Sequence, residues 1–251
     1  MSYTALALTL IFVLIPLLLS KTLRLGLEKD TIVATVRSII QLLAVGYLLQ
    51  FVFDSEHGIY IVLMILLMIG AAVENVRKKG LFIKGITWKV AVTIVCIELL
   101  TQGILLGLGI TPPTAQYIIP LSGMVIGNAM VLSILFLNRF ISEVEAHEDE
   151  AELILSLGGT PKQAIHSQLI SSIKASMIPT IESQKTMGLV QLPGMMSGQI
   201  IAGADPLKAV MFQLLVLFLL LTAAAVSGIM LGFLSYPSLF NDRLQLIRFK
   251  Q

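Results

Sequence analysis

The sequence predicts an all-α membrane protein with about seven transmembrane helices, its N-terminus outside the cell and its C-terminus in the cytoplasm. Hydrophobic residues fill 56% of the 251 positions and charged residues 13%, about half the charged share of an average soluble domain. So few charges cannot cover a water-facing surface, which excludes a soluble globule, a disordered chain and a nucleic-acid-binding protein. The single cysteine, Cys96, excludes an intramolecular disulfide and a cysteine-based zinc cluster.

Seven segments approach the roughly 20 apolar residues that a membrane-spanning helix needs. Because no basic residue precedes the first apolar run, we interpret that run as a permanent helix and not as a cleavable signal. The sixth segment is weak, since it contains Pro193-Gly194, and a re-entrant hairpin is the alternative to a crossing there. The predicted spans are 3–20, 31–53, 58–73, 88–109, 117–137, 183–203 and 209–233.

The positions of the basic residues predict the orientation of these spans. With the N-terminus outside, every one of the 17 Lys and Arg residues except Lys208 falls on the cytoplasmic side or near it, as the positive-inside rule requires. This pattern supports a sixth crossing, because without one the basic tail would lie outside. We therefore expect a multi-pass protein of the cell (inner or plasma) membrane, with residues 1–251 forming a single permease domain in contact with lipid.

One cytoplasmic segment, at about 138–182, is large enough to dock a partner. Acidic residues open it, and Gly158-Gly159 then predicts the end of a helix. Thr160 fits an N-cap, Pro161 the first helical position and Gln163 the third helical position, which completes a capping box. A second helix is therefore expected to begin directly after the glycines. The hairpin could simply link two spans, or it could bind a cytoplasmic protein.

Two pairs of polar residues lie inside predicted spans, where a charge is costly. Arg37 and Gln41 are one helical turn apart, and so are Glu98 and Gln102. Arg37 and Glu98 both lie in the cytoplasmic part of their predicted spans, so one interpretation is an ion pair that holds the two helices together. The others are that the Arg37 side chain extends to the lipid headgroups, or that the pair serves cargo or gating.

Further candidates for a translocation path lie in the fifth and sixth predicted spans. Asn128 is flanked by glycines that allow close helix packing, and Pro193 interrupts a span and frees backbone carbonyls. Met195 and Met196 offer soft thioether ligands, and Glu182 a hard oxygen ligand. For each, packing or a solvated surface position is the alternative. No metal ligand set can be named from the sequence.

The run from Met187 to Gln199, Met-Gly-Leu-Val-Gln-Leu-Pro-Gly-Met-Met-Ser-Gly-Gln, resembles the FetB-like family of bacterial iron-export ABC permeases, to which plant aluminium-tolerance membrane proteins are similar. Ala202 to Pro206 and Glu74-Asn75 also match. The resemblance covers essentially the whole chain. It implies a permease that moves a metal, chiefly iron, out of the cytoplasm. The hairpin would then be the ATPase-coupling element, formed by Leu157, Gly158, Gly159, Thr160, Pro161, Gln163 and Ala164.

The sequence contains no G-x-x-x-x-G-K-[ST] phosphate-binding loop. An ABC exporter built on this chain therefore needs a separate ATPase that binds ATP-Mg, and we expect this chain to bind no cofactor of its own. ABC ATPases act in pairs, which implies a homodimer of the permease. No motif indicates an enzyme. The alternatives are an ATP-independent channel or secondary transporter, and a membrane scaffold or regulator with an ABC-like docking loop.

Overall fold

The structure is a computed structural model, which describes residues 9–55, 57–79, 83–241 and 243–247. By its internal contacts the chain divides into two units, residues 1–57 and 58–251. The single domain expected for residues 1–251 thus stays a prediction.

The first unit contains helices α2 (Ile11–Leu23) and α3 (Glu28–Asp54). The turn between them is held by Ser20, whose hydroxyl donates to Glu28 Oε1 at 2.8 Å and accepts from the Leu27 N–H at 3.1 Å. Helix α3 confirms the second predicted span as a helix. The first predicted span, 3–20, lies partly outside the described residues, and its described part is the short apolar helix α2.

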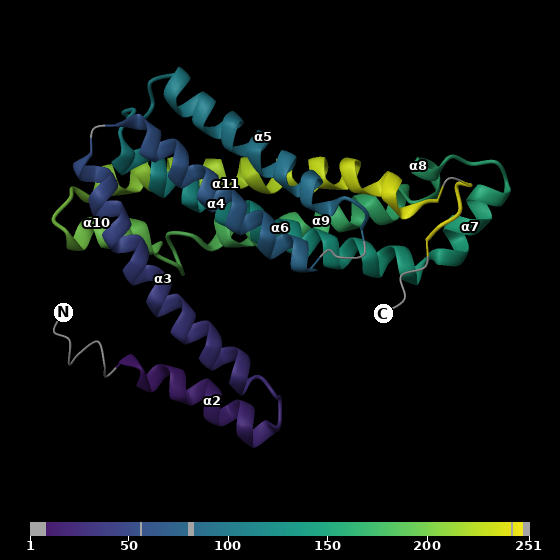
Figure 1. Ribbon diagram of the computed structural model, residues 1–251, viewed down its shortest axis with the longest axis horizontal. Helices are drawn as coiled ribbons and strands as arrows, with labels where there is room; N and C mark the ends of the chain where they lie inside the picture. The colour runs from purple at the N-terminus through teal and green to yellow at the C-terminus, as the bar shows by residue number, and fades with distance from the viewer. Residues whose placement is uncertain (1–8, 56, 80–82, 242, 248–251) are drawn as a thin grey trace. The chain divides into compact units, whose positions relative to one another are not determined.

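The second unit is an all-helical bundle (Figure 1). Its long helices are α4 (Gly58–Lys79), α5 (Ile86–Gly107), α6 (Ala115–Ala146), α9 (His166–Thr186) and α11 (Pro206–Ser235). Three short helices join them or cap the ends: α7 (Glu148–Ser156), α8 (Pro161–Ala164) and α10 (Gly194–Ile201). A 3-10 turn, η1 (Tyr236–Leu239), follows α11. The buried ammonium group of Lys89 on α5 donates a hydrogen bond to the Ser238 hydroxyl in this turn.

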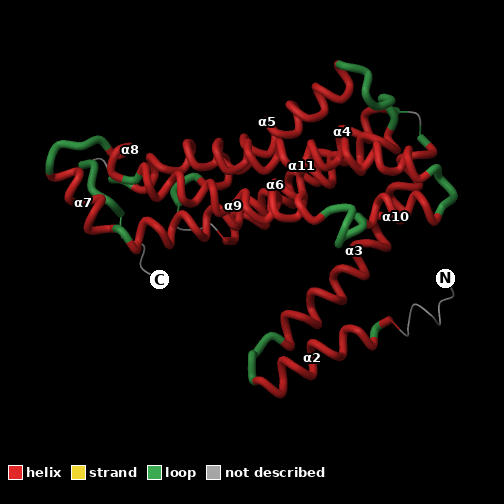
Figure 2. The backbone as a smooth tube through the Cα atoms, turned by 180° about the vertical axis from the view of Figure 1, so that it is seen from behind, coloured by secondary structure: helices red, strands yellow, loops and turns green. Residues whose placement is uncertain are grey.

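The long helices of the bundle alternate in direction, which Figures 1 and 2 show from opposite sides. Helices α6 and α11 both start at the end that carries α10. The chain between them must therefore return along the bundle, and α9 does so, packed against α6 and α11. Most of α9 belongs to the segment 138–182 that the sequence predicts to be cytoplasmic, and its position relative to the membrane stays a prediction.

The predicted sixth span, 183–203, is not one continuous helix. Helix α9 ends at Thr186, residues 187–193 form an irregular turn, and α10 begins at Gly194. The interruption at Pro193-Gly194 is confirmed and extends over more residues than expected. The last turn of α9, the irregular turn and the short helix α10 therefore occupy the residues of the predicted span.

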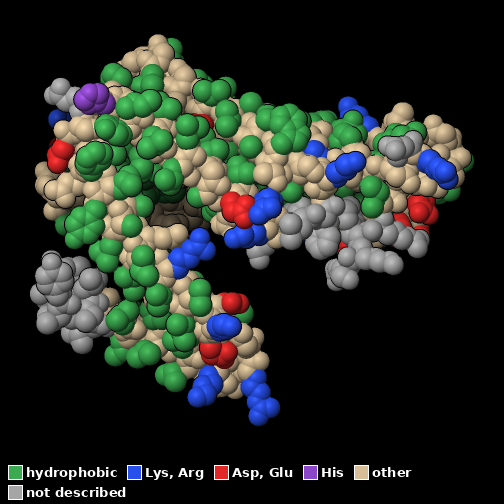
Figure 3. Space-filling view, in the orientation of Figure 1, with side chains coloured by type: hydrophobic (Ala, Val, Ile, Leu, Met, Phe, Trp, Pro, Cys, Tyr) green, Lys and Arg blue, Asp and Glu red, His purple; other side chains and the backbone are tan. Residues whose placement is uncertain are grey.

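Five helices are long and apolar enough to cross a membrane among the residues the structure describes: α3, α4, α5, α6 and a segment beginning with α11. Figure 3 shows hydrophobic side chains over much of the visible surface of the second unit, and Lys and Arg side chains toward the end that carries α7 and α8. Such an apolar surface is stable in lipid and not in water. The chain is a multi-pass membrane protein; its number of crossings and its orientation stay predictions.

Two glycines of α11 let α9 approach closely. A Cβ atom at Gly228 would lie 3.1 Å from Ser176 Oγ, and one at Gly232 would lie 2.8 Å from Leu169 Cδ1. Gly228 and Gly232 are four residues apart on one face of α11, a spacing of small residues that allows helices in a membrane to pack closely. At Gly127, by contrast, an added Cβ would meet nothing within 4 Å.

Candidate functional site

The hairpin between α7 and α8 has the glycine turn that the sequence predicts. Gly158 has φ +86°, in the left-handed region that favours glycine. Its N–H donates to the Leu155 carbonyl at 3.0 Å, and the Gly159 N–H donates to the Ile154 carbonyl at 2.9 Å. These two bonds form a Schellman motif. A Cβ at Gly159 would lie 2.5 Å from Ile154 Cγ2 and 2.8 Å from the Ile154 carbonyl oxygen, so both glycines are required.

The start of α8 has the predicted capping box. The Gln163 side chain accepts from the Thr160 N–H at 2.8 Å, and the Thr160 hydroxyl accepts from the Gln163 N–H at 3.3 Å. Pro161 occupies the first turn, as predicted. Ala164 is buried, while Leu157 is 79% exposed at the turn. The hairpin is therefore anchored by its second helix and presents an apolar tip.

Lys162 anchors α8 to α11, because its ammonium lies 5.5 Å from the centroid of the Phe233 ring, within cation–π range. Helix α8 ends after one turn, and α9 begins at His166 after a break at Ile165. The second helix of the hairpin is thus in two pieces, which the sequence did not predict.

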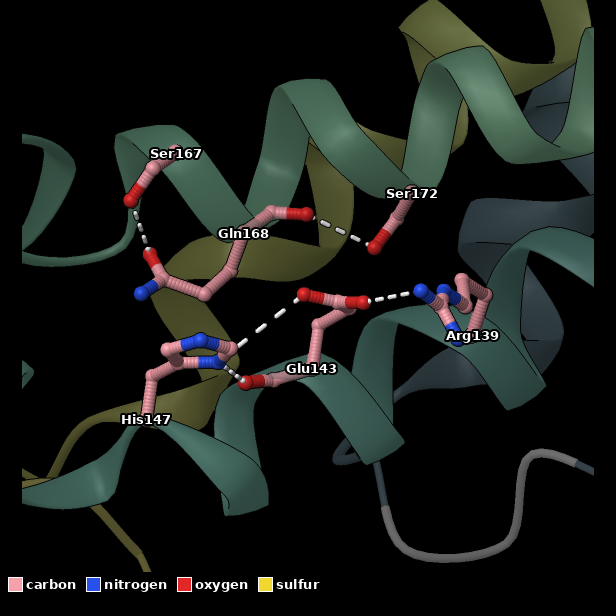
Figure 4. Close-up of polar contacts among 6 residues, drawn as sticks. All are labelled: Arg139, Glu143, His147, Ser167, Gln168 and Ser172. Atoms are coloured by element: carbon pink, nitrogen blue, oxygen red, sulfur yellow. Dashed lines mark hydrogen bonds and ion pairs between the residues drawn. The ribbon is translucent and has the colours of Figure 1, made fainter.

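Beside the hairpin, polar residues line the junction of α6 and α9 (Figure 4). The exposed Arg139 and the partly buried Glu143 form an ion pair at 2.5 Å, one turn apart on α6. His147 Nδ1 lies 2.9 Å from the Glu143 carbonyl oxygen. On α9, the Gln168 side chain is buried and accepts from the Ser167 hydroxyl at 2.9 Å. Helix α6 therefore continues through the expected start of the cytoplasmic segment at residue 138.

A second candidate site is a pocket of about 220 Å³ between α6, α9 and α11. Its polar lining is neutral and comes mainly from α9, with Asn128 from α6. The side-chain amide of Asn128 donates a hydrogen bond to the Leu220 carbonyl at 3.2 Å. The side-chain amide of Gln184 donates one to the Leu217 carbonyl at 3.1 Å. The lining residues are Asn128, Val131, Leu132, Pro179, Thr180, Ser183, Gln184, Met187, Leu217 and Leu220.

This pocket lies where α9 is irregular. Pro179 is inside the helix and has no N–H, so the Ala175 carbonyl loses its usual helical partner. Eight residues further on, the helix ends and the irregular turn begins at Met187. Asn128 is 13 residues from the start of α6, about 20 Å along its axis. The predicted span 117–137 would place Asn128 within a hydrocarbon core of about 30 Å.

Among the residues that line this pocket, the sequence analysis singled out Asn128 but not Pro179, Thr180, Ser183 or Gln184. The sequence contains a signal for this site, because Pro179 is followed by Thr180, Ser183 and Gln184, whose spacing places them on one face of a helix. Pro179 and Thr180 lie in the segment 138–182 that the sequence predicts to be cytoplasmic, whereas Ser183 and Gln184 lie at the start of the predicted sixth span.

The other predicted path residues do not gather at this pocket. Glu98 on α5 accepts a hydrogen bond from Ser122, and Met195 packs against an apolar cluster that includes Leu105. Glu182 is exposed and pairs with Lys185 at 2.7 Å.

Pro193 caps α10 and Met196 lies in that helix, while Arg37 and Gln41 belong to α3 of the first unit. Whether Arg37 meets Glu98 therefore stays a prediction. Within the described part of the chain, no three His, Cys, Asp or Glu side chains gather as a metal site.

Comparison with known proteins identifies the family. A family model described as "Uncharacterised protein family (UPF0014)" matches residues 3–240. The chain belongs to this family.

Three relatives of this UPF0014 chain match over nearly its whole length. It is 56% identical to "UPF0014 membrane protein YjkA" of Bacillus subtilis, with 98% of each chain covered. It is 39% identical to "Probable iron export permease protein FetB" of Escherichia coli, over 97% of this chain and 94% of that one. It is 33% identical to "Protein ALUMINUM SENSITIVE 3" of Arabidopsis thaliana, over 96% and 88%.

These relatives confirm the resemblance inferred from the run that begins at Met187. No solved structure matches the chain.

Proposed function

We propose that this UPF0014 chain is the membrane-spanning subunit of an ABC exporter, which moves iron or another metal out of the cytoplasm. The observation that carries the proposal is the 39% identity to a protein named a probable iron export permease, over 97% of the chain. The α7–α8 hairpin supports it, because a rigid turn with an exposed apolar tip is suited to transmit motion from a cytoplasmic ATPase to α9.

The ATPase-coupling residues in this proposal fall into two groups. Gly158, Gly159, Thr160, Pro161 and Gln163 fix the geometry of the turn. Leu157 is the exposed contact, and Ala164 anchors the hairpin in the bundle. ATP-driven closure of the ATPase pair would move the hairpin, and α9 would carry that movement to the pocket around Asn128, which would open alternately to the two sides.

The pocket is the proposed cargo path. Discontinuous helices with irregular backbone at membrane depth commonly line binding sites in transporters, and α9 with the turn 187–193 has this form. Its neutral amide and hydroxyl oxygens suit a hard or borderline cation, whereas the Met187 thioether is softer. Iron follows from the name of one relative; another metal or a small organic solute is the alternative cargo.

A homodimer is part of the proposal. In the turn 187–193, Leu189 is 92% exposed and Val190 is 84% exposed. Irregular backbone at membrane depth is tolerated only where protein or a water-filled cavity covers it. A second copy of the chain would provide that cover, and two copies match the two ATPase subunits that an ABC transporter needs.

Capture of the full-length chain from its own membrane, in mild detergent, tests this proposal. We expect an ABC ATPase to co-purify, with two permease copies and two ATPase copies in each particle. A chain that is captured without any ATPase, and that transports alone after reconstitution, would favour the ATP-independent channel or secondary transporter.

A further inference from the structure

A buried polar cluster between α5 and α6 lies outside both candidate sites. It consists of Glu98, Gln102 one turn later on α5, and Ser122 on α6. The Gln102 amide donates to the Ser122 hydroxyl at 2.8 Å, and that hydroxyl donates to Glu98 Oε1 at 2.5 Å. Glu98 is 5% exposed and Ser122 is fully buried. A chain of hydrogen bonds therefore leads from the amide to the carboxyl.

Two acceptors of this cluster remain without a partner. Glu98 Oε2 and Gln102 Oε1 are both inaccessible to solvent, and neither has a hydrogen bond within the described residues. Buried polar atoms nearly always have a partner. Both unpartnered atoms are acceptors, so the cluster has no hydrogen-bond donor for either of them. One proton on Oε2 would turn that oxygen into a donor.

No described side chain supplies a positive charge to Glu98 within the second unit. The side chain that hydrogen bonds its carboxyl is Ser122, which in turn accepts from Gln102. Among the charged and titratable groups on α5 itself and on the helices packed against it, none forms an ion pair with Glu98. The groups with described side chains are Tyr60, Glu74, Arg77 and Lys78 on α4, Lys89 and Cys96 on α5, Tyr117, Arg139, Glu143 and Glu145 on α6, and Lys208 on α11.

We propose that Glu98, Gln102 and Ser122 form a proton-binding site in the membrane, in which Glu98 is a neutral carboxylic acid while α5 and α6 are packed together. An unpaired carboxylate at this place would carry a large desolvation cost, whereas the neutral acid carries much less. When α5 and α6 separate and water enters, the O–H bond of Glu98 breaks and the proton passes to water. Opening of the bundle is then coupled to the release of one proton per chain.

A proton fits this site better than a metal ion. A metal needs several oxygen ligands around an accessible centre, and neither unpartnered oxygen is reached by solvent. This inference goes beyond transport by an ABC exporter and does not depend on the ATPase. It also differs from an Arg37–Glu98 ion pair, in which Glu98 would be ionised.

Infrared difference spectroscopy of the purified full-length chain tests the proton directly. At neutral pH we expect a carbonyl band of a buried carboxylic acid in the parent protein, absent in Glu98→Gln and retained in Glu182→Gln, which removes an exposed acid. The Ser122→Ala variant should shift this band, because the acid loses its hydrogen-bond donor. A parent spectrum identical to that of Glu98→Gln would overturn the proposal, as would loss of the band when ferrous ions are added.

Thermal unfolding of the same proteins gives a second readout. Gln is close in shape to the neutral acid, so Glu98→Gln should unfold within a few degrees of the parent. An ion pair predicts the opposite, a large loss in Glu98→Gln that is partly recovered by the double variant with Arg37→Gln. That recovery, or failure of Glu98→Gln to fold, would overturn the neutral acid.

Discussion

Gly232 shows how much a single residue can determine in this bundle. It faces Leu169 of α9 and Phe136 of α6, at distances that leave no room for a side chain. Gly127, on α6, has open space where a Cβ would be. The two glycines are alike in sequence, because each belongs to a small-residue pair, and only the structure separates their roles.

We predict that Gly232→Val lowers the free energy of unfolding by about 1–3 kcal/mol, the usual cost of overpacking. The same substitution at Gly127 should cost less, because its Cβ meets no neighbour. Thermal unfolding in detergent measures both. Equal losses in the two variants would contradict the assigned contact between α9 and α11.

Some residue-scale features could be predicted from sequence, and others could not. The Thr160–Gln163 capping box and the Gly158 turn follow from local chemistry, so the sequence alone predicted both. The Glu98–Ser122 bond and the bond from Asn128 to the Leu220 carbonyl join different helices. Such contacts depend on how helices pack, and hydrophobic spacing does not determine that.

At the scale of elements, the α7–α8 hairpin is the rigid part of the proposed coupling mechanism. Its turn is stabilised by the hydrogen bonds that the Gly158 and Gly159 N–H groups donate and by the capping box. A cation–π contact between Lys162 and Phe233 connects it to α11. An element fixed in this way can transmit a displacement to α9, which begins immediately after α8. A flexible linker could not.

Replacing both Gly158 and Gly159 with Val should therefore reduce ATPase binding and cargo-stimulated ATP hydrolysis at least several-fold, while insertion and abundance stay near normal. The matched control is Gly109→Val, because Gly109 also has a positive φ, +65°, but lies between α5 and α6. Co-purification and turnover are measured in both. If the double variant binds and hydrolyses like the parent, the hairpin is only a linker.

The boundaries of elements were harder to predict than their existence. Four predicted spans correspond to continuous helices α3, α4, α5 and α6, and the seventh to α11. Helix α6 extends to Ala146 because its last turns pack against α9 and are paired through Arg139 and Glu143. Helix α9 was missed as part of the bundle because its buried face contains serine and glutamine, which look like surface residues in sequence.

For the whole molecule, family membership and the multi-pass architecture are established, and the proposed mechanism connects three regions of the second unit. The α7–α8 hairpin would receive motion from an ATPase, and the pocket around Asn128 would carry cargo. The Glu98 cluster would exchange a proton as the helices separate. A proton gradient is not the energy source in this account, because ATP hydrolysis drives the cycle.

Transport by inside-out vesicles that contain only the purified chain and its co-purified ATPase tests the central claim most directly. With ATP and ferrous iron outside, we predict that iron accumulates inside, that accumulation needs ATP hydrolysis, and that it persists when a protonophore removes any proton gradient. Iron uptake that proceeds without ATP, or that the protonophore abolishes while ATP hydrolysis continues, would contradict an ATP-driven exporter and favour a channel or a secondary transporter.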